Sequence, residues 1–221
     1  MTYAGEEFTE RSPTVAPPLV WYAAYGSNMY PDRLAVYLRG GTPPGGARRH
    51  PGCRDPRPPA RSAPVTLPGL LYFATESLVW GGGRAFWDPD APEGEVPAHA
   101  YLLTLGQFSD IAAQEMGRAP GRDLDLTEAL RTGRATLGPG RYETLVCVGE
   151  HEGRPMLSFT APWRCDHVPP VAPAAAYLRH LGAGLIAAHG WPPARAAAYL
   201  AGRPGARGHW TSEQVEALLT R

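Results

Sequence analysis

The distribution of apolar positions predicts where regular structure begins. Residues 19–24 read Leu-Val-Trp-Tyr-Ala-Ala, an apolar run of strand length that lacks the alternation of a half-exposed strand. We therefore expect a buried central strand there. After the loop at residues 25–30, Pro31 is suited to the first turn of a helix, and this helix has an apolar stripe formed by Leu34, Tyr37 and Leu38.

Later apolar patterns predict more strands and then mostly helices. Strands are expected at residues 69–75, 83–87 and 97–105, followed by a helix over 107–116 and a hairpin whose strands are 141–148 and 155–160. The last third is rich in Ala and Leu and predicts helices near 173–188, 192–200 and 212–220. Thr211 and Gln214 fit a capping box that opens the last helix.

Two segments do not fit a packed element. Residues 39–68 contain eight prolines, five glycines and six arginines against one acid, Asp55, so we expect a long basic loop that is solvated or covers a pocket. Residues 1–18 combine acids and prolines and are expected to form a flexible tail. The predicted architecture is therefore one α+β domain over residues 19–221, a small mixed β-sheet or β-barrel flanked by helices.

Composition narrows the possible functions. The 21 basic and 21 acidic residues cancel, so charge gives no case for nucleic acid or a membrane as partner. All 21 basic residues are Arg, and the absence of Lys excludes Schiff-base chemistry. Three cysteines without a Cys-x-x-Cys pair fit neither a disulfide framework nor a thiolate zinc site, and no apolar run is long enough to span a bilayer. We expect a cytoplasmic protein without metal or cofactor.

Glu115 is the most informative candidate. In the predicted helix, Phe108, Ile111, Ala112 and Met116 occupy an apolar face at i, i+3, i+4 and i+8, and Glu115 takes the missing i+7 position. Burial and the negative end of the helix dipole would both raise the pKa of this carboxyl, as suits a proton-exchanging acid. A structural Glu paired with Arg118 or Arg122 explains the same pattern.

The loop Tyr25-Gly26-Ser27-Asn28 is the second candidate. A loop between a buried strand and a helix directs free backbone N–H groups outward, and its Gly lets a ligand approach, so it suits a carboxylate, phosphate or oxyanion. An ordinary turn in which Ser27 or Asn28 caps the helix is the alternative.

Other groups of reactive residues are weaker. Cys165-Asp166-His167 places three reactive types side by side, although a nucleophile and its base normally meet through folding. The segment His50-Pro51-Gly52-Cys53 is half of a possible metal site without a second half of suitable spacing.

The chain resembles the γ-glutamylcyclotransferase family at several points. Residues 25–29, Tyr-Gly-Ser-Asn-Met, look like the family's loop after its first strand, and residues 80–85, Trp-Gly-Gly-Gly-Arg-Ala, resemble its W-x-G-G-x-A turn and strand. Further matches, in the family's order, are Glu95-Val96, Gln114-Glu115, and Tyr177 ahead of Gly184, His189-Gly190 and Pro192. The resemblance spans roughly residues 19–200.

The resemblance implies a small β-barrel with flanking helices whose cavity converts a γ-glutamyl amine or peptide into 5-oxoproline and a free amine. The family's acid/base carboxylate corresponds to Glu115, and its substrate loop to residues 25–28. Pocket tyrosines correspond to Tyr142 and Tyr177. The substrate's own α-amine is then the nucleophile, so only a small-molecule partner and one proton-transferring carboxylate are required.

Three departures from the family pattern concern the shape of the pocket. Met116 stands between Glu115 and Gly117, where the family commonly has Glu-Gly, and Pro97-Ala98 replace an aromatic residue and a Gly. The segment between Gly117 and Tyr142 is also longer than in compact relatives. Two alternatives to a cyclotransferase stay open: a non-catalytic binding module on the same scaffold, and a hydrolase that uses Cys165 and His167. The sequence predicts neither the released amine nor the oligomeric state.

Overall fold

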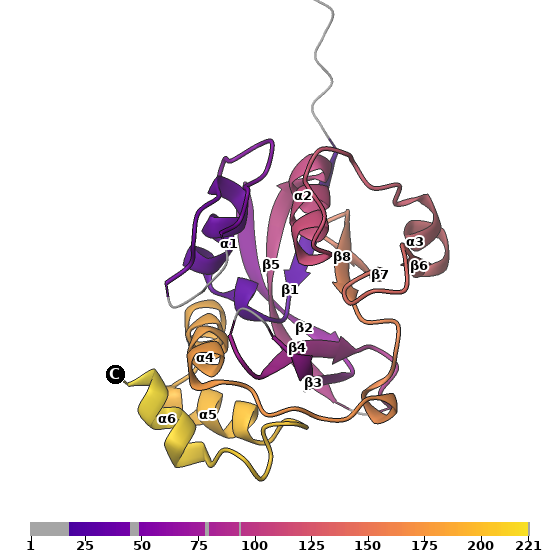
Figure 1. The fold of residues 1–221 in the computed structure, drawn as a ribbon. Helices are drawn as coiled ribbons and strands as arrows, with labels where there is room; N and C mark the ends of the chain where they lie inside the picture. The colour runs from indigo at the N-terminus through magenta and orange to yellow at the C-terminus, as the bar shows by residue number, and fades with distance from the viewer. Residues whose placement is uncertain (1–17, 45–48, 78–79, 93, 221) are drawn as a thin grey trace, which may run out of the picture.

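The computed structural model describes residues 18–44, 49–77, 80–92 and 94–220. Most of the expected N-terminal tail, residues 1–17, therefore lies outside the described residues. Figure 1 shows strands at the centre, with helices α1, α2 and α4 around them and α5 and α6 at the C-terminal end of the chain.

Among the described residues, six strands form one mixed sheet in the order β2-β5-β1-β8-β7-β6. The central strand β1 is antiparallel to β5 and parallel to β8, and its residue Tyr22 lies opposite Tyr101 on one side and Leu157 on the other. This confirms the expected buried central strand. The strands are β1 (Leu19–Ala24), β2 (Arg61–Pro68), β5 (Glu95–Thr104), β6 (Arg134–Thr136), β7 (Thr144–His151) and β8 (Arg154–Thr160).

The described strands do not close into a barrel. The edge strands β2 and β6 are not paired with each other, and β3 (Leu70–Glu76) and β4 (Gly83–Asp88) form a separate two-stranded antiparallel sheet. The mixed α+β sheet is thus confirmed, and the barrel form of the expectation is wrong for these residues. A barrel requires hydrogen bonds between its first and last strands, and here the last strand, β6, pairs only with β7.

The expectation of a long loop over residues 39–68 is wrong for its last part, because Arg61–Pro68 form strand β2. It pairs over its whole length with β5, with Pro64 opposite His99 and Pro68 opposite Glu95. Proline cannot donate to a β-ladder, yet it is tolerated on an edge strand, where one side of the backbone has no partner strand. The many prolines therefore pointed to a loop where the chain forms an edge strand.

In the described part of the chain, six α-helices flank the sheets. The sequence predicted five of them, including the capping box of α6, in which Thr211 accepts from the backbone N–H of Gln214. The short α3 was not predicted. None of the helices in the described part of the chain is long and apolar enough to cross a membrane. The helices are α1 (Pro31–Arg39), α2 (Leu105–Glu115), α3 (Thr127–Thr132), α4 (Ala175–His189), α5 (Pro193–Ala201) and α6 (Ser212–Leu219).

The two faces of β1 belong to two hydrophobic cores. Val20, Tyr22 and Ala24 pack with α1 and α2, whereas Ala23 packs with the β3–β4 hairpin and helices α4, α5 and α6. Successive side chains of a strand point to opposite faces, so a strand buried on both faces is apolar throughout. Burial on both faces explains the continuous apolar run at residues 19–24. Because β1 ends inside the molecule, the loop that follows it also begins there.

The glycines at the start of β4 allow the segment that leads into α4 to lie close to the hairpin. A Cβ atom on Gly83 would lie 2.0 Å from the Val171 carbonyl oxygen, and one on Gly82 would lie 2.8 Å from the Ala172 carbonyl oxygen. The Gly83 N–H also donates to the Ala172 carbonyl at 2.8 Å. The segment leading into α4 therefore packs directly on the glycine turn, which fixes the start of the helix that carries Tyr177.

Candidate active site

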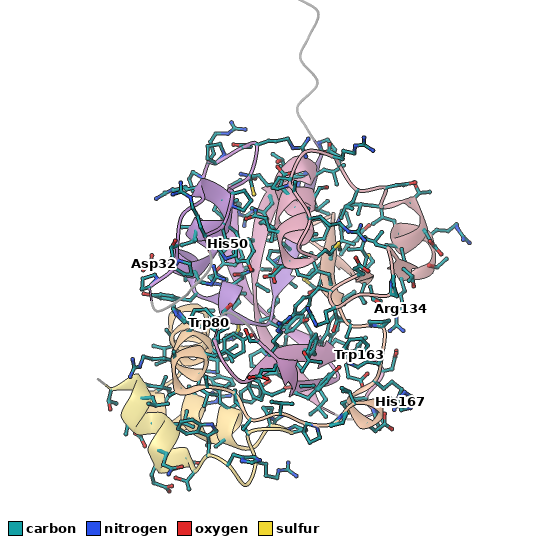
Figure 2. The ribbon with its side chains drawn as sticks, viewed as in Figure 1. Asp32, His50, Trp80, Arg134, Trp163 and His167 are labelled. Atoms are coloured by element: carbon teal, nitrogen blue, oxygen red, sulfur yellow. The ribbon has the colours of Figure 1, made fainter. Side chains whose placement is uncertain are left out.

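A cavity of about 630 Å³ opens where the end of β1, the end of α2 and the start of β4 meet. Its lining includes every residue that the γ-glutamylcyclotransferase resemblance selected for the site. In Figure 2, His50 and Trp80 lie on the α1 and α4 side of the molecule and Trp163 lies on the opposite side, and all three line this cavity. The candidate site residues are Tyr25, Gly26, Ser27, Asn28, Glu115, Tyr142 and Tyr177.

Glu115 is the last residue of α2, and the helix places its carboxylate in the cavity. The helix begins with a capping box in which the Thr104 side chain accepts from the backbone N–H of Gln107, and Phe108, Ile111 and Ala112 are fully buried against the sheet. Because these three residues fix the rotation of the helix, Glu115 at i+7 faces the same interior. The apolar pattern predicted this placement.

Burial raises the pKa of the Glu115 carboxyl above its ordinary value of 4.5. A hydrogen bond with Tyr37, the charge of Arg33, a hydrogen bond with Asn28 and the charge of Arg84 act in the opposite direction, without cancelling the effect of burial. The Asn28 Nδ2 donates to Glu115 Oε1 at 3.1 Å. The carboxyl is therefore a stronger base than a solvated glutamate and is held by donors in a fixed orientation.

The alternative reading of Glu115 as half of an ion pair does not match the geometry. Arg118, one of the two proposed partners, pairs instead with Glu143. Within the described parts of the chain, no Arg lies within 4 Å of the Glu115 carboxylate oxygens, Arg122 included. The carboxylate is thus available to a ligand in the cavity.

The loop at residues 25–28 supplies the neighbouring wall. The Tyr25 hydroxyl donates to the Phe159 carbonyl at 2.9 Å, which anchors the loop to β8, and residues 27–29 form a 3-10 turn, η1 (Ser27–Met29). Neither η1 nor α1 has a side-chain cap, so Ser27 and Asn28 are not the helix caps that the alternative reading required. The Asn28 Oδ1 is buried and has no hydrogen-bond partner among the residues that the structure describes.

Tyr142 and Tyr177 meet at a single residue, Ala85 of the glycine-rich motif. The Tyr177 hydroxyl accepts from the Ala85 N–H at 3.2 Å, and the Tyr142 hydroxyl donates to the Ala85 carbonyl at 3.0 Å. Tyr142 has a φ of 62°, an uncommon value for a residue with a side chain. The structure therefore brings together the motif at residues 80–85 and both tyrosines that the resemblance selected.

Several cavity residues were missed by the sequence reasoning. Arg33 is 4% exposed, its guanidinium lies 4.6 Å from the Tyr37 ring centre, and its Nη2 is 3.2 Å from His50 Nε2. Since Arg33 has only donors, His50 Nε2 accepts this bond. The signal that could have found Arg33 is its i, i+4 spacing from Tyr37 on the stripe of α1.

The Cys165-Asp166-His167 group lies outside the residues that line the cavity. Burial, together with a hydrogen bond to Asp88, raises the pKa of the Cys165 thiol, which disfavours the thiolate that a nucleophile requires. The His167 Nε2 is 3.7 Å from Asp166 in an exposed turn. Of the proposed half metal site, His50 lines the cavity, whereas the Cys53 thiol donates to the Tyr37 carbonyl at 3.3 Å.

No family model matches the chain. A protein named histone deacetylase 5 from Arabidopsis thaliana is 33% identical over 184 residues, which are 76% of this chain and 28% of that protein. The chain thus spans just over a quarter of the length of this relative.

Three solved structures are similar at 18% identity. A human protein described as uncharacterized has a TM-score of 0.49, with 92% of this chain and 99% of that chain covered. A structure named gamma-glutamyl cyclotransferase has a TM-score of 0.47, with 91% and 98% covered, and YkqA from Bacillus subtilis has one of 0.40, with 76% and 48% covered. The solved structures similar to this chain thus include a γ-glutamyl cyclotransferase, the class of protein that its sequence motifs resemble.

Proposed function

We propose that the protein is a γ-glutamyl cyclotransferase-like enzyme, which converts a γ-glutamyl amine or peptide into 5-oxoproline and the free amine. The observation that carries the proposal is the Glu115 carboxylate, which has a raised pKa and accepts from Asn28 of the Tyr-Gly-Ser-Asn loop inside a cavity of substrate size. A cavity that only binds a ligand does not need a buried base beside such a loop.

The reaction needs one proton acceptor that later becomes a donor. The carboxylate of Glu115 takes a proton from the substrate's α-ammonium group, and the freed nitrogen attacks the γ-carbonyl carbon. A new C–N bond closes the five-membered ring, and the carbonyl oxygen becomes an oxyanion. The oxyanion then reforms the carbonyl, the original γ-amide C–N bond breaks, and Glu115 returns the proton to the departing nitrogen. The ring nitrogen still carries a second proton, which the regenerated Glu115 carboxylate accepts and passes to the released amine.

The loop and the cavity walls supply the rest of the catalysis. Backbone N–H groups at residues 25–28 are the donors proposed for the glutamyl carboxylate or the oxyanion, while the Asn28 side chain donates to Tyr22 and Glu115. The aromatic walls formed by Tyr22, Tyr142 and Tyr177 favour the folded conformer in which the amine approaches its own γ-carbonyl. Because the nucleophile belongs to the substrate, neither Cys165 nor a bound water has to attack.

The test is mass spectrometry of the full chain incubated with a panel of γ-glutamyl amines and peptides. We expect 5-oxoproline and the free amine. The matched control is the same compound with an acetyl group on its α-amine, which removes the nucleophile and should abolish turnover. Release of glutamate without 5-oxoproline, or turnover of the acetylated compound, would show hydrolysis instead. Binding of these compounds without any turnover would favour the non-catalytic binding module.

A further inference from the structure

Two side chains of strand β5 hold the backbone of the 3-10 turn η1. The Tyr101 hydroxyl donates to the Met29 carbonyl at 2.7 Å, and His99 Nδ1 lies 2.9 Å from the same oxygen. A carbonyl oxygen only accepts, so His99 Nδ1 carries the proton of this hydrogen bond. The two rings also pack together, with their centres 4.2 Å apart. His99 and Tyr101 therefore form a two-donor clamp on Met29.

The register of β5 places both donors beside the start of the loop at residues 25–28. Residues 99 and 101 are two apart in the strand, so their side chains point to the same face of the sheet. They lie opposite Ala24 and Tyr22 of β1, the strand that leads into the loop. His99 is 6% exposed, Tyr101 is 3% exposed, and neither lines the cavity. The clamp thus holds the loop without contacting a ligand in the cavity.

The clamped residue directly follows Asn28, whose amide contacts the proposed base. Asn28 Nδ2 donates to Glu115 Oε1 at 3.1 Å and to the Tyr22 hydroxyl oxygen at 3.4 Å. Since neither η1 nor α1 has a side-chain cap, contacts from elsewhere in the fold must fix this turn. A displacement of the Met29 backbone also displaces Asn28, because the two are neighbours in a turn of three residues. The Glu115 carboxyl is therefore connected to β5 through Asn28.

The charged and polar surroundings of Glu115 make this connection measurable. Burial raises the pKa of the carboxyl, whereas the hydrogen bond from Tyr37, the charge of Arg33, the hydrogen bond from Asn28 and the charge of Arg84 lower it. Weakening the Asn28 bond alone would remove one of the lowering effects and leave the pKa of Glu115 higher than in the wild type. The acid limb of the rate profile therefore reports how well Asn28 is placed.

The clamp itself stays in one protonation state at neutral pH. Burial lowers the pKa of His99, and its hydrogen bond to Met29 opposes this effect only in part. The titratable groups beside it are Tyr101, whose pKa is raised by burial, and His189 of α4, whose pKa is lowered by burial. At neutral pH the His99 ring is thus uncharged and donates its single N–H to Met29.

We propose that His99 and Tyr101 are positioning residues that act through Asn28 on the carboxylate that transfers the proton. By holding the Met29 carbonyl, they keep the Asn28 amide within hydrogen-bond distance of Glu115. For its effect on turnover, this inference rests on the proposed cyclotransferase function. Neither residue of the clamp takes part in the proton transfers.

The first experiment removes one donor of the clamp and keeps its ring. In Tyr101→Phe we expect kcat/KM for 5-oxoproline release at neutral pH to fall about tenfold, because the base is less well oriented. The midpoint of the acid limb should rise by about half a pH unit, and in Asn28→Ala it should rise by about one pH unit. A merely structural role of Tyr101 would lower the thermal midpoint without moving the acid limb.

The double variant tests whether the clamp acts through Asn28. When Asn28→Ala is already present, adding Tyr101→Phe should not move the acid limb further, because the group through which Tyr101 acts has been removed. Additive shifts of the midpoint would overturn the proposal. An unchanged acid limb in a folded Tyr101→Phe single variant would overturn it as well.

A pair of substitutions at His99 keeps the test decisive if Tyr101→Phe does not fold. His99→Asn retains an N–H close to the position of Nδ1 and should keep the wild-type acid limb, whereas His99→Leu should raise its midpoint as Tyr101→Phe does. Equal midpoints in these two variants would contradict the clamp. Tyr199→Phe on α5 is the matched control: its buried hydroxyl has no hydrogen-bond partner among the described residues and does not line the cavity, so activity should be unchanged.

A readout independent of turnover separates this inference from the proposed function. A ¹³C NMR titration of labelled Glu carboxyls, with the Glu115 signal identified by its loss in Glu115→Gln, measures the pKa directly. If the wild type releases no 5-oxoproline, the proposed function fails, and this titration alone decides whether the clamp places Asn28. A Glu115 pKa that rises in Asn28→Ala and in Tyr101→Phe supports the clamp, whereas one that does not change in Tyr101→Phe overturns it.

Discussion

The carboxyl group of Glu115 affects both the stability of the fold and the proposed reaction. Burial raises the pKa of its carboxyl, so the folded protein binds this proton more tightly than the unfolded chain does. The stabilising contribution of the group is complete below the ordinary pKa of 4.5 and is lost as the pH rises through the raised value. Above the raised pKa, the ionised carboxylate no longer contributes this stability and is available as a base.

Replacing this carboxyl with an isosteric amide should separate activity from stability. We expect Glu115→Gln to lower kcat by about 10²-fold to 10⁴-fold, because no other group in the proposed mechanism transfers the proton. The thermal midpoint at neutral pH should be unchanged or higher, since the buried charge is gone. Measuring 5-oxoproline release and thermal unfolding on the same samples checks both.

The exposed Glu128 on α3 provides the control for this substitution, and Glu128→Gln should affect neither quantity. A folded Glu115→Gln variant with wild-type turnover would contradict the catalytic role. Loss of activity that occurs only together with loss of folding would show that Glu115 has a structural role instead.

The pH dependence of the wild type gives a second test at this residue. The carboxylate form must accept the first proton, so kcat/KM should rise with pH through the Glu115 pKa, and the midpoint of this acid limb should lie above 4.5. Initial rates from pH 4 to pH 8, with a parallel check that the protein stays folded, measure the limb. A midpoint at or below 4.5 would show that a solvated carboxyl controls the rate.

The packing of helix α4 against the 3-10 turn η1 controls the loop that holds Asn28. A Cβ atom on Gly184 of α4 would lie 2.6 Å from the Met29 Cβ and 3.0 Å from the Tyr30 backbone nitrogen. Backbone atoms cannot move aside without displacing the loop. The close approach of α4 is therefore part of what positions Asn28 against Glu115.

Gly184→Ala should consequently lower both stability and activity. Alanine gains up to about 1 kcal/mol over glycine in a helix, but forcing a methyl group into this contact costs about 1–3 kcal/mol and shifts the loop. Denaturant unfolding and 5-oxoproline release measure the two effects.

Gly182→Ala on the same helix is the matched control. The three atoms nearest to its Cβ atom would all belong to the side chain of Leu219 on α6, which can change its conformation. This variant should keep the activity of the wild type. Equal losses of activity in both variants would mean that α4 does not position the loop specifically.

The sequence predicted elements whose apolar pattern is long and regular. The continuous run of β1 and the i, i+3, i+4 face of α2 were both found, and with them the placement of Glu115. Strand β6 and helix α3 are too short for a pattern to stand out, with three and six residues. Strand β2 was missed because its prolines dominate the local signal, while its strand structure depends on β5, which lies far along the chain.

Candidate site residues were predictable from the sequence only where a motif or a helical face marked them. The roles assigned to residues 25–28, Tyr142 and Tyr177 stay predictions, although all of them line the cavity. Arg33 could have been found from its i, i+4 spacing to Tyr37, whereas Arg84 is brought to the same cavity only by tertiary contacts. Tertiary proximity of this kind cannot be found from spacing along the chain.

At the scale of the whole molecule, the cavity is built without any of the three cysteines. Cys53 is half-buried and burial raises its thiol pKa to about 12, and the pKa of Cys165 is raised as well. Thiols with raised pKa values react slowly with alkylating agents because the thiolate is the reactive form. The proposed reaction likewise uses no metal.

We therefore expect activity to survive both iodoacetamide and a chelator such as EDTA. The 5-oxoproline assay before and after each treatment measures this, and mass spectrometry reports which cysteines were modified. Inactivation in proportion to Cys165 alkylation would support the hydrolase alternative. Loss on chelation that a divalent metal reverses would show that the reaction depends on a metal.

The pairing of β1 with β8 sets the order in which the protein can be completed during synthesis. Strand β1 is synthesised before β5 and β8 and can pair with β5 first. Its other edge stays unpaired until β8 has been synthesised. The Tyr25 hydroxyl likewise donates to a carbonyl that lies 134 residues farther along the chain. Until Arg154–Thr160 has emerged, an apolar strand edge is open to other chains. From the emergence of β1 until that of β8, the nascent chain thus carries an aggregation-prone edge, and the cavity can form only after Tyr177 has also emerged.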